Sequence, residues 1–258
     1  MFIRAVTTIA FVSLLAPVAL AETIAKTYPV KNFTEFVSGG NTTVDIIQDG
    51  SEYLRVEADA EVMKRVKVDQ TGNRVSVWVK SEGNFFGWFG HGNDPVRVTL
   101  RVKQLEYLEI SGGSHAKVGD LQGEKFHLNV SGAGDVDFAK LNTGDFKADL
   151  SGAANVRIDS VNSQSQSYEL SGASNTNVKS ASSSQKLHVS ASGASNFRGK
   201  KLIAKNADLE ASGASHVEVA VTETLNANAS GASSVNYYGN PKAKTDSSGA
   251  SHVNAHTD

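Results

Sequence analysis

Apolar and polar residues alternate along most of this chain, and the alternation is organised around a short repeated word. The word is Ser-Gly followed by Ala or Gly. The fifth and seventh residues after its serine are mostly apolar and the sixth is polar, as in Val136, Asp137 and Phe138. The residues just before the serine alternate in the same way, as in Asn129 and Val130. A period of two predicts half-buried β-strands on both sides of the word.

The word occurs at eight places, from Ser111 to Ser248, with nearly constant spacing. Successive serines are 20, 20, 20, 21, 20, 18 and 18 residues apart, which indicates stacked structural units. Each unit is expected to hold a strand, a corner, a second strand and a looser return with one further apolar residue, such as Leu121, Leu141 or Val161. Because coils stacked in parallel share one core, we predict an all-β fold, a parallel β-solenoid or β-helix-like stack of coils of about 20 residues.

The repeated words are the predicted corners of these coils. Glycine supplies a backbone conformation that residues with side chains avoid, and the small residue after it fits a sharp turn. The predicted corner residues are Ser111, Gly112, Ser131, Gly132, Ser151, Gly152, Ser171, Gly172, Ser192, Gly193, Ser212, Gly213, Ser230, Gly231, Ser248 and Gly249. Asn155, Asn175 and Asn196 each lie four residues after a corner serine, and we expect them to form a side-chain ladder between coils.

The two ends of the repeat region are expected to differ. Residues 22–105 are strand-like but irregular, and we expect coils that cap one end of the stack, with Ser38 at an early corner. Residues 106–258 are the regular repeats, and residues 22–258 are expected to form one continuous domain. The last word is followed only by a short alternating stretch. An unpaired strand there would favour self-association through the C-terminal edge.

The first residues have the pattern of a secretory signal peptide. Arg4 precedes an apolar stretch, and the sequence Ala-Leu-Ala ends at Ala21, which is typical of a cleavage site. An uncleaved membrane anchor is the alternative, but Pro17 and a run shorter than about 20 residues argue against it. We therefore expect cleavage after Ala21 and an exported protein, either periplasmic or extracellular at the cell surface.

Composition narrows the chemistry of the mature chain. The sequence contains no cysteine, which excludes disulfides, thiol catalysis and thiolate metal sites. Removal of Arg4 with the signal peptide leaves 24 basic and 27 acidic residues, a net charge of −3. This balance gives no indication of binding to nucleic acid or to an anionic membrane surface. No cofactor is expected.

Serine and histidine residues are the first candidates for a site. The word serine recurs at equivalent places, which is typical of a structural position and not of a nucleophile that needs an oriented base. His115, His216 and His252 are candidate metal ligands, but strands about 4.8 Å apart would leave His216 and His252 roughly 10 Å apart. Residues 131–139 resemble a calcium-binding glycine and aspartate nonapeptide but occur once. No catalytic or metal site is predicted from these residues.

Charged residues on adjacent coils offer a further candidate. Asp135, Asp137, Arg157 and Asp159 would lie on one face, where a cluster of acids and a base could cleave an acidic polysaccharide. The alternative, which we favour, is a row of cross-strand charge pairs that stabilise the sheet by about 0.2–1 kcal/mol each.

Residues 83–95 form a glycine-rich stretch that is unusually aromatic for a loop. Its candidate contact residues are Phe85, Phe86, Trp88 and Phe89. The loop is expected either to fold back as a hydrophobic plug over the N-terminal coils or to contact a partner protein, a glycan or a membrane.

Three features of the sequence resemble those of a known family. They are the segment RVTLRVKQLEYLEISGGSH, the repeated SGAxN corners, and the segment SGASSVNYYGNP at residues 230–241. The chain is similar over residues 33–253 to the bacterial family called "putative auto-transporter adhesin, head GIN domain". The resemblance implies an exported β-solenoid-like domain without catalytic residues. We expect a non-enzymatic envelope or surface protein that binds an unidentified envelope component, glycan or protein, and not nucleic acid. The alternatives are a self-assembling structural element and a β-helix enzyme acting on polysaccharide.

Overall fold

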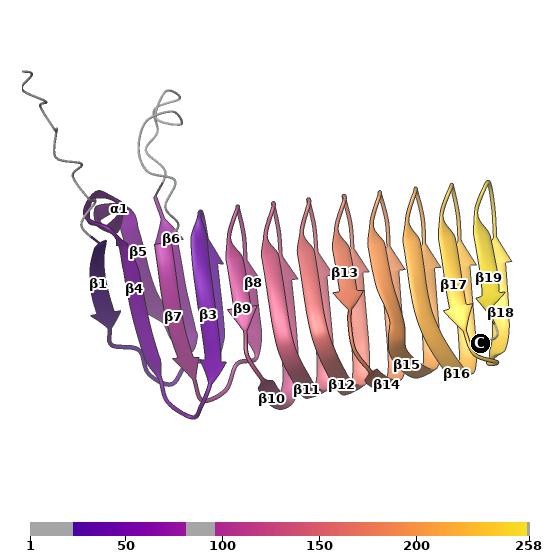
Figure 1. Ribbon diagram of the computed structural model, residues 1–258, viewed down its shortest axis with the longest axis horizontal. Coiled ribbons are helices and arrows are strands. Elements are labelled where there is room, and N and C mark those ends of the chain that lie inside the picture. The colour runs from indigo at the N-terminus through magenta and orange to yellow at the C-terminus, as the bar shows by residue number, and fades with distance from the viewer. Residues whose placement is uncertain (1–22, 81–95, 257–258) are drawn as a thin grey trace, which may run out of the picture.

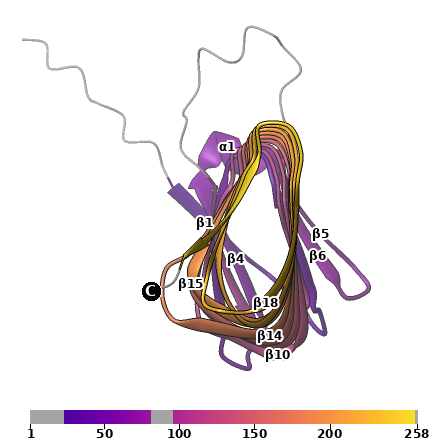
Figure 2. The ribbon, with the colours of Figure 1, turned by 90° about the vertical axis from the view of Figure 1, so that its right-hand side faces the viewer.

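The computed structural model describes residues 23–80 and 96–256. Within these residues nineteen strands join in one sheet, which winds into a stack of coils, and one short helix lies at the N-terminal end (Figure 1). Viewed along the stack, the coils superimpose in a teardrop outline with one narrow and one wide end (Figure 2). The predicted parallel β-solenoid is confirmed.

The regular coils are built from strands that pair in parallel with their equivalents in the coils before and after. Val136, for example, lies between Ala116 and Val156. The pairing is in register because equivalent residues are one repeat apart, so each inward apolar side chain meets another. The strands are β8 (Tyr107–Ile110), β9 (His115–Val118), β10 (Leu121–Val130), β11 (Asp135–Leu150), β12 (Asn155–Leu170), β13 (Asn175–Val178), β14 (Ser182–Ala191), β15 (Asn196–Ala211), β16 (His216–Ala229), β17 (Ser234–Tyr238), β18 (Lys242–Ser247) and β19 (His252–His256).

The return of the coil is more regular than the sequence predicts. β11, β12 and β15 are each 16 residues long and β16 is 14, so in these coils the strand continues from the corner around the wide end. Leu141 and Val161 are buried in this segment and lie opposite each other in parallel register. The expected looser return is therefore wrong for these coils, because neighbouring strands bend together and keep their ladder of hydrogen bonds.

Aromatic rings fill the middle of the core. Phe126 stacks on Phe146 with 5.9 Å between ring centroids, and Phe146 meets Tyr168 edge-on at 5.4 Å. Tyr168 in turn packs against Phe197 at 4.7 Å. All four side chains are buried. Rings shared between successive coils remove large apolar areas from water and so hold the stack together without disulfides.

The N-terminal end departs from the simple coil pattern. β2 and β3 pair in parallel with β8 and β9 and continue the solenoid. Beyond them the pairs β1–β4, β4–β7 and β5–β6 are antiparallel. α1 lies at this end and buries Val62 and Met63. The bounds of these elements are β1 (Thr23–Tyr28), β2 (Glu35–Gly39), β3 (Thr42–Gln48), β4 (Tyr53–Asp59), α1 (Ala60–Arg65), β5 (Val66–Thr71), β6 (Arg74–Val79) and β7 (Val96–Val102).

Ser38 lies at a corner, but one position earlier than expected. Ser38 pairs with Ile110, and the carbonyl of Gly40 accepts a hydrogen bond from the amide of Gly113. Gly40, with a φ of 99°, is therefore the counterpart of the later corner glycines. Ser38 is buried and its hydroxyl lies 2.8 Å from that of Thr42. The predicted early corner at Ser38 is present, and Gly39 occupies the place of the corner serine within it.

Candidate functional site

The corners form the narrow edge of the solenoid. The glycines of the eight words all have a φ between 71° and 77°, a region that residues with a Cβ atom rarely adopt. Each corner also stacks directly on the preceding one, so that the amide of Ala153 donates to the carbonyl of Gly132 at 2.7 Å. A Cβ atom on any of these glycines would lie 2.5–3.1 Å from the carbonyl oxygen of the corner below. Both the conformation and the close stacking therefore require glycine.

The residue directly after each three-residue word has a role that sequence reasoning missed. This position is buried in every coil and holds only small residues, as in Ser174, Ser195 and Ala154. The hydroxyls of Ser174 and Ser195 donate to the carbonyls of Ser171 and Ser192, both at 2.7 Å, and so close the turn from inside. The restriction to Ser, Gly and Ala was the available signal, because a larger side chain would not fit within the corner.

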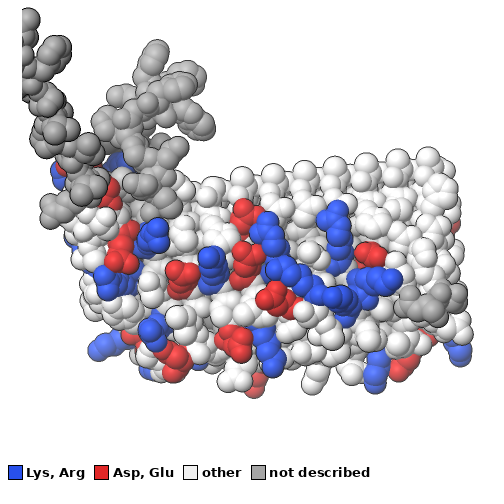
Figure 3. All heavy atoms as spheres, in the orientation of Figure 1, with Lys and Arg blue, Asp and Glu red and all other residues white. Residues whose placement is uncertain are grey.

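The edge made by the corners presents no charge. The first three residues of each word are Ser, Gly and Ala or Gly, and the third is exposed in all eight coils. Figure 3 shows this edge as a regular white row along the top of the molecule. These small residues allow the chain to turn sharply between the two flat faces. The charged and amide side chains of the solenoid lie on those faces.

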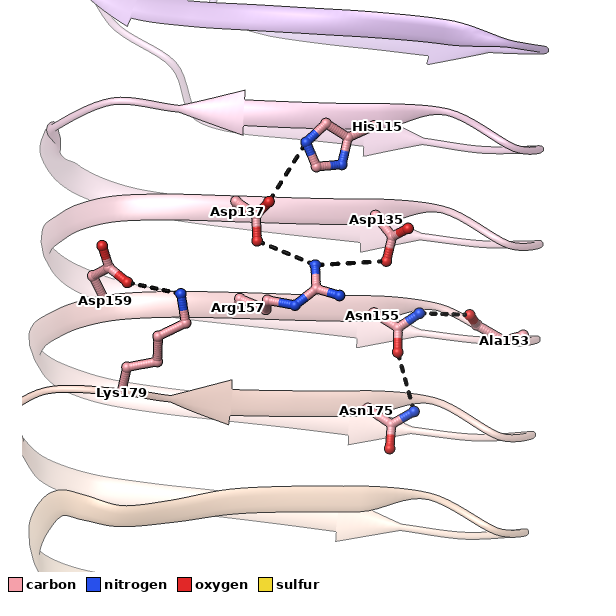
Figure 4. Close-up of polar contacts among 9 residues, drawn as sticks. All are labelled: His115, Asp135, Asp137, Ala153, Asn155, Arg157, Asp159, Asn175 and Lys179. Atoms are coloured by element: carbon pink, nitrogen blue, oxygen red, sulfur yellow. Dashed lines mark hydrogen bonds and ion pairs between the residues drawn. The ribbon is translucent and has the colours of Figure 1, made fainter. Parts of the chain in front are cut away.

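The predicted asparagine ladder is confirmed on the face that follows the corners. Asn175 Nδ2 donates to Asn155 Oδ1 at 3.1 Å, and Asn196 Nδ2 donates to Asn175 Oδ1 at 2.9 Å. Asn155 Nδ2 also donates to the carbonyl of Ala153 at 3.2 Å (Figure 4). The amides thus connect three coils and fix the outward residues in a straight column.

The acidic candidates lie on the same face and are paired with basic groups. Arg157 lies 3.3 Å from Asp137 and 3.9 Å from Asp135, while His115 lies 3.5 Å from the other oxygen of Asp137 (Figure 4). Asp159 does not join this group, because it faces Lys179 at 3.1 Å. These side chains are partly exposed on a flat surface. The geometry is that of cross-strand ion pairs, which we favoured over a catalytic cluster.

The three histidines of interest lie apart. His216 Nδ1 is 2.7 Å from the hydroxyl of Ser234, and Ser234 separates His216 from His252 in the parallel register. His115 lies several coils away and faces Asp137. Within the residues that the structure describes, no group of three His, Asp or Glu side chains is arranged to hold a metal ion.

The ionisable groups with shifted pKa values lie near the N-terminal coils and in the core. Hydrogen bonds from the hydroxyl and amide of Ser51, with Arg101 nearby, lower the pKa of Asp49 from 3.8 to about 2. Burial and a hydrogen bond to Glu109 raise the pKa of Tyr107 to about 12. Burial alone raises the pKa of Tyr168. These shifts follow from local hydrogen bonds and burial.

A shallow groove runs beside the corner edge on the opposite face. Carboxylates and hydroxyls line it in successive coils, among them Asp149, Glu169, Ser190, Glu210 and Asp246. The groove is open to solvent along its length, so it offers hydrogen-bonding groups without excluding water.

The predicted signal peptide, residues 1–21, lies outside the described residues. The same holds for the aromatic contact residues Phe85, Phe86, Trp88 and Phe89. No helix within the described part of the chain has the length and apolar character needed to cross a membrane.

The model of the family described as "Putative auto-transporter adhesin, head GIN domain" matches residues 32–241, which include all but the last regular coil. The chain belongs to this family. The head GIN domain assignment agrees with the resemblance inferred from the corner words. No curated protein matches the chain.

Several solved structures share this fold. A "putative adhesin" of Parabacteroides distasonis superimposes with a TM-score of 0.80 at 15% identity, covering 92% of this chain and 98% of its own. A "putative adhesin" of Parabacteroides merdae has a TM-score of 0.78 at 16% identity, with coverage of 91% and 96%. A "putative lipid binding protein" of Parabacteroides distasonis has a TM-score of 0.73 at 17% identity, also covering 91% and 96%. At such identities the likeness establishes the fold.

Proposed function

We propose that this head GIN domain chain is a non-enzymatic, exported binding module of the cell envelope or cell surface. The observation that carries the proposal is the arrangement of outward side chains in straight, in-register columns along the stack, such as Asn155, Asn175 and Asn196. Rigid columns on a flat face suit recognition of an extended partner, because little side-chain entropy remains to be lost on binding. The family description as an adhesin agrees with this role.

The arrangement of the acidic candidates argues against the alternative of a polysaccharide-cleaving enzyme. General acid–base catalysis requires an acid and a base within hydrogen-bond reach of one scissile group. Here Asp137 is held by Arg157 and His115, and Asp159 by Lys179, on an open surface. We expect the purified chain not to cleave acidic polysaccharides. Cleavage by the unmodified chain that is lost in Asp137→Ala would overturn this expectation.

The proposed partner is an envelope component, either a glycan or a protein. The test is retention of bacterial envelope fractions by the immobilised chain, compared with a variant in which Phe85, Phe86, Trp88 and Phe89 are replaced by Ser. We expect the unmodified chain to retain envelope material. Retention lost in the variant would place the contact at these four aromatic residues. No retention by either protein would contradict the proposed function.

A self-assembling structural element is the second candidate. β18 pairs with β16 and β19 with β17, and within the described residues no strand covers the outer edges of β18 and β19. Exposed edges can pair with the same edges of another copy. Sedimentation over a wide concentration range tests this, and a monomer at every concentration would rule it out.

A further inference from the structure

The overall negative charge conceals a local concentration of basic side chains. Arg157 in β12, Lys179 directly after β13, and Arg198, Lys200 and Lys201 in β15 belong to three successive coils and project from the face that follows the corners. Asp159 is the one acidic residue on this face of these coils. Figure 3 shows Lys and Arg gathered over the middle of this face. We name these five residues the basic patch.

The parallel register arranges the patch along the axis of the solenoid. Arg157, Asn177 and Arg198 occupy the same column in consecutive coils. Strands about 4.8 Å apart place the two arginine Cα atoms roughly 10 Å apart with the Asn177 amide between them. The structure gives no ion pair or hydrogen bond to the side chains of Asn177 and Arg198 among the described residues.

A bulge in β15 directs the lysines outward. Gly199 pairs with Val219 but Ile203 pairs with Ala220, so Lys200 and Lys201 have no counterpart in β16. Together with a second, opposite shift of one residue after Ala204, this bulge accounts for the change of the repeat from 20 to 18 residues at this point. A Cβ atom on Gly199 would lie 2.6 Å from the ring of Phe197, so this position at the start of the bulge requires glycine. Bulges commonly redirect side chains at functional sites.

Neighbouring side chains fix part of the patch. The ammonium group of Lys200 lies 3.9 Å from the centroid of the Tyr238 ring, and the Tyr238 hydroxyl donates to Glu218 at 2.8 Å. The same ring is stacked on His256. Tyr238 therefore positions Lys200, and its ring is already in contact with a cation and an imidazole.

We propose that the basic patch binds an acidic polysaccharide that lies along the solenoid axis. The guanidinium of Arg198 suits a carboxylate of such a chain, and the Asn177 amide lies beside it to bond a sugar hydroxyl. Arg157, which is already paired with Asp137, adds positive charge on the other side of Asn177. The inference rests on the proposed function and names its ligand class. A membrane surface is less well matched, because Ile203 is the only large apolar side chain on β15 that is exposed. Single-stranded nucleic acid would need exposed rings for stacking, which the patch lacks.

The test is calorimetric titration of the full chain with polygalacturonate at about 50 mM and about 500 mM NaCl. Loss of two charge-assisted contacts in the double variant Arg198→Gln with Lys200→Gln is expected to weaken binding about tenfold or more. The matched control is Lys242→Gln with Lys244→Gln, which changes the net charge equally on exposed β18 residues. We expect the control to bind within about twofold of the unmodified chain.

Three outcomes would overturn the proposal: no binding of polygalacturonate, equal weakening by the control pair, or tighter binding to phosphatidylglycerol vesicles or single-stranded DNA than to polygalacturonate. The envelope retention experiment separates this failure from that of the proposed function. Envelope material retained equally by the Arg198→Gln, Lys200→Gln variant would remove the patch as the contact and leave the binding role intact.

Discussion

The amide nitrogen of Ala173 donates a hydrogen bond to the carbonyl oxygen of Gly152 at 2.7 Å, and this bond joins one corner to the next. The same bond recurs at the equivalent residues of the other corners, with lengths from 2.7 to 3.0 Å. Stability of the stack therefore depends on the exact shape of a turn that contains almost no side-chain atoms.

Gly172→Ala tests this dependence. The φ of 73° disfavours any Cβ atom, and the new methyl group would lie 2.5 Å from the Gly152 carbonyl oxygen. We expect the free energy of unfolding to fall by about 2 kcal/mol or more. Urea denaturation provides the measurement, with the exposed neighbour Ala173→Ser as control, expected to change stability by less than about 0.5 kcal/mol. Equal effects of the two substitutions would contradict the stacking argument.

The buried serine of the corner should be less sensitive to loss of its hydroxyl than to added volume. Ser195 donates to the Ser192 carbonyl at 2.7 Å, but Ala154 occupies the equivalent place in another coil. Ser195→Ala is expected to lower the free energy of unfolding by about 1 kcal/mol, and Ser195→Val by about 1–3 kcal/mol through overpacking. Thermal and urea unfolding measure both, and Val tolerated as well as Ala would show that the corner has spare room.

A buried polar pair provides a third prediction. The Tyr168 hydroxyl donates to Gln166 Oε1 at 2.9 Å, and Gln166 Nε2 donates to the carbonyl of Ser183 at 3.0 Å. Tyr168→Phe leaves Gln166 Oε1 without its donor inside the core, so we expect a loss of about 1–3 kcal/mol. Tyr237→Phe is the control, because the structure gives the Tyr237 hydroxyl no hydrogen bond among the described residues. Unfolding in urea that does not distinguish the two variants would show that the buried bond contributes nothing.

The free energy of unfolding should also fall at acidic pH, because two carboxylates of the N-terminal coils have lowered pKa values. The pKa of Asp49 is lowered to about 2 by hydrogen bonds from Ser51, and that of Glu52 is lowered by Lys103. A folded-state pKa below the unfolded one stabilises the fold above the unfolded pKa, here near 3.8 for Asp49, and this gain is lost as pH falls through the folded pKa. We expect Asp49→Asn with Glu52→Gln to reduce the loss of unfolding free energy between about pH 5 and pH 2.

Urea titrations at a series of pH values measure this effect. The control is Glu223→Gln, at an exposed residue with no ion pair in the described part of the chain. The control is expected to leave the acid slope of the unmodified protein in place. An unchanged slope in the Asp49→Asn, Glu52→Gln variant would show that the acid sensitivity arises elsewhere.

Most of the fold could be predicted from the spacing of the repeat. Equivalent residues such as Val136 and Val156 are one coil apart, so the parallel register and the inward face follow from arithmetic and period alone. The N-terminal antiparallel pairs could not be predicted in this way. The pairing of β1 with β4, for example, joins residues without a common repeat, and the offset of Ser38 depends on which of two glycines turns the chain.

The surface was harder to predict than the core. Arg157 and Arg198 are far apart in sequence but lie in one column of the sheet, on either side of Asn177. A net charge summed over the chain averages such groups with acids on the other face and hides the basic patch. The ion pair of Arg157 with Asp137 could be predicted from the repeat, because the two residues are one coil apart. The bulge at Lys200 could not, because it is a departure from the repeat.

The corner-to-corner bonds have a consequence for how such molecules vary in length. Each coil meets only the coils on either side, and the bond from Ala173 to Gly152 has the same form as the bond from Ala153 to Gly132. Excision of one complete repeat would bring Ala173 over Gly132 and restore the same contact, whereas excision of half a repeat would set a strand against a corner. The length of the solenoid can therefore change by whole coils, while its cross-section stays the same.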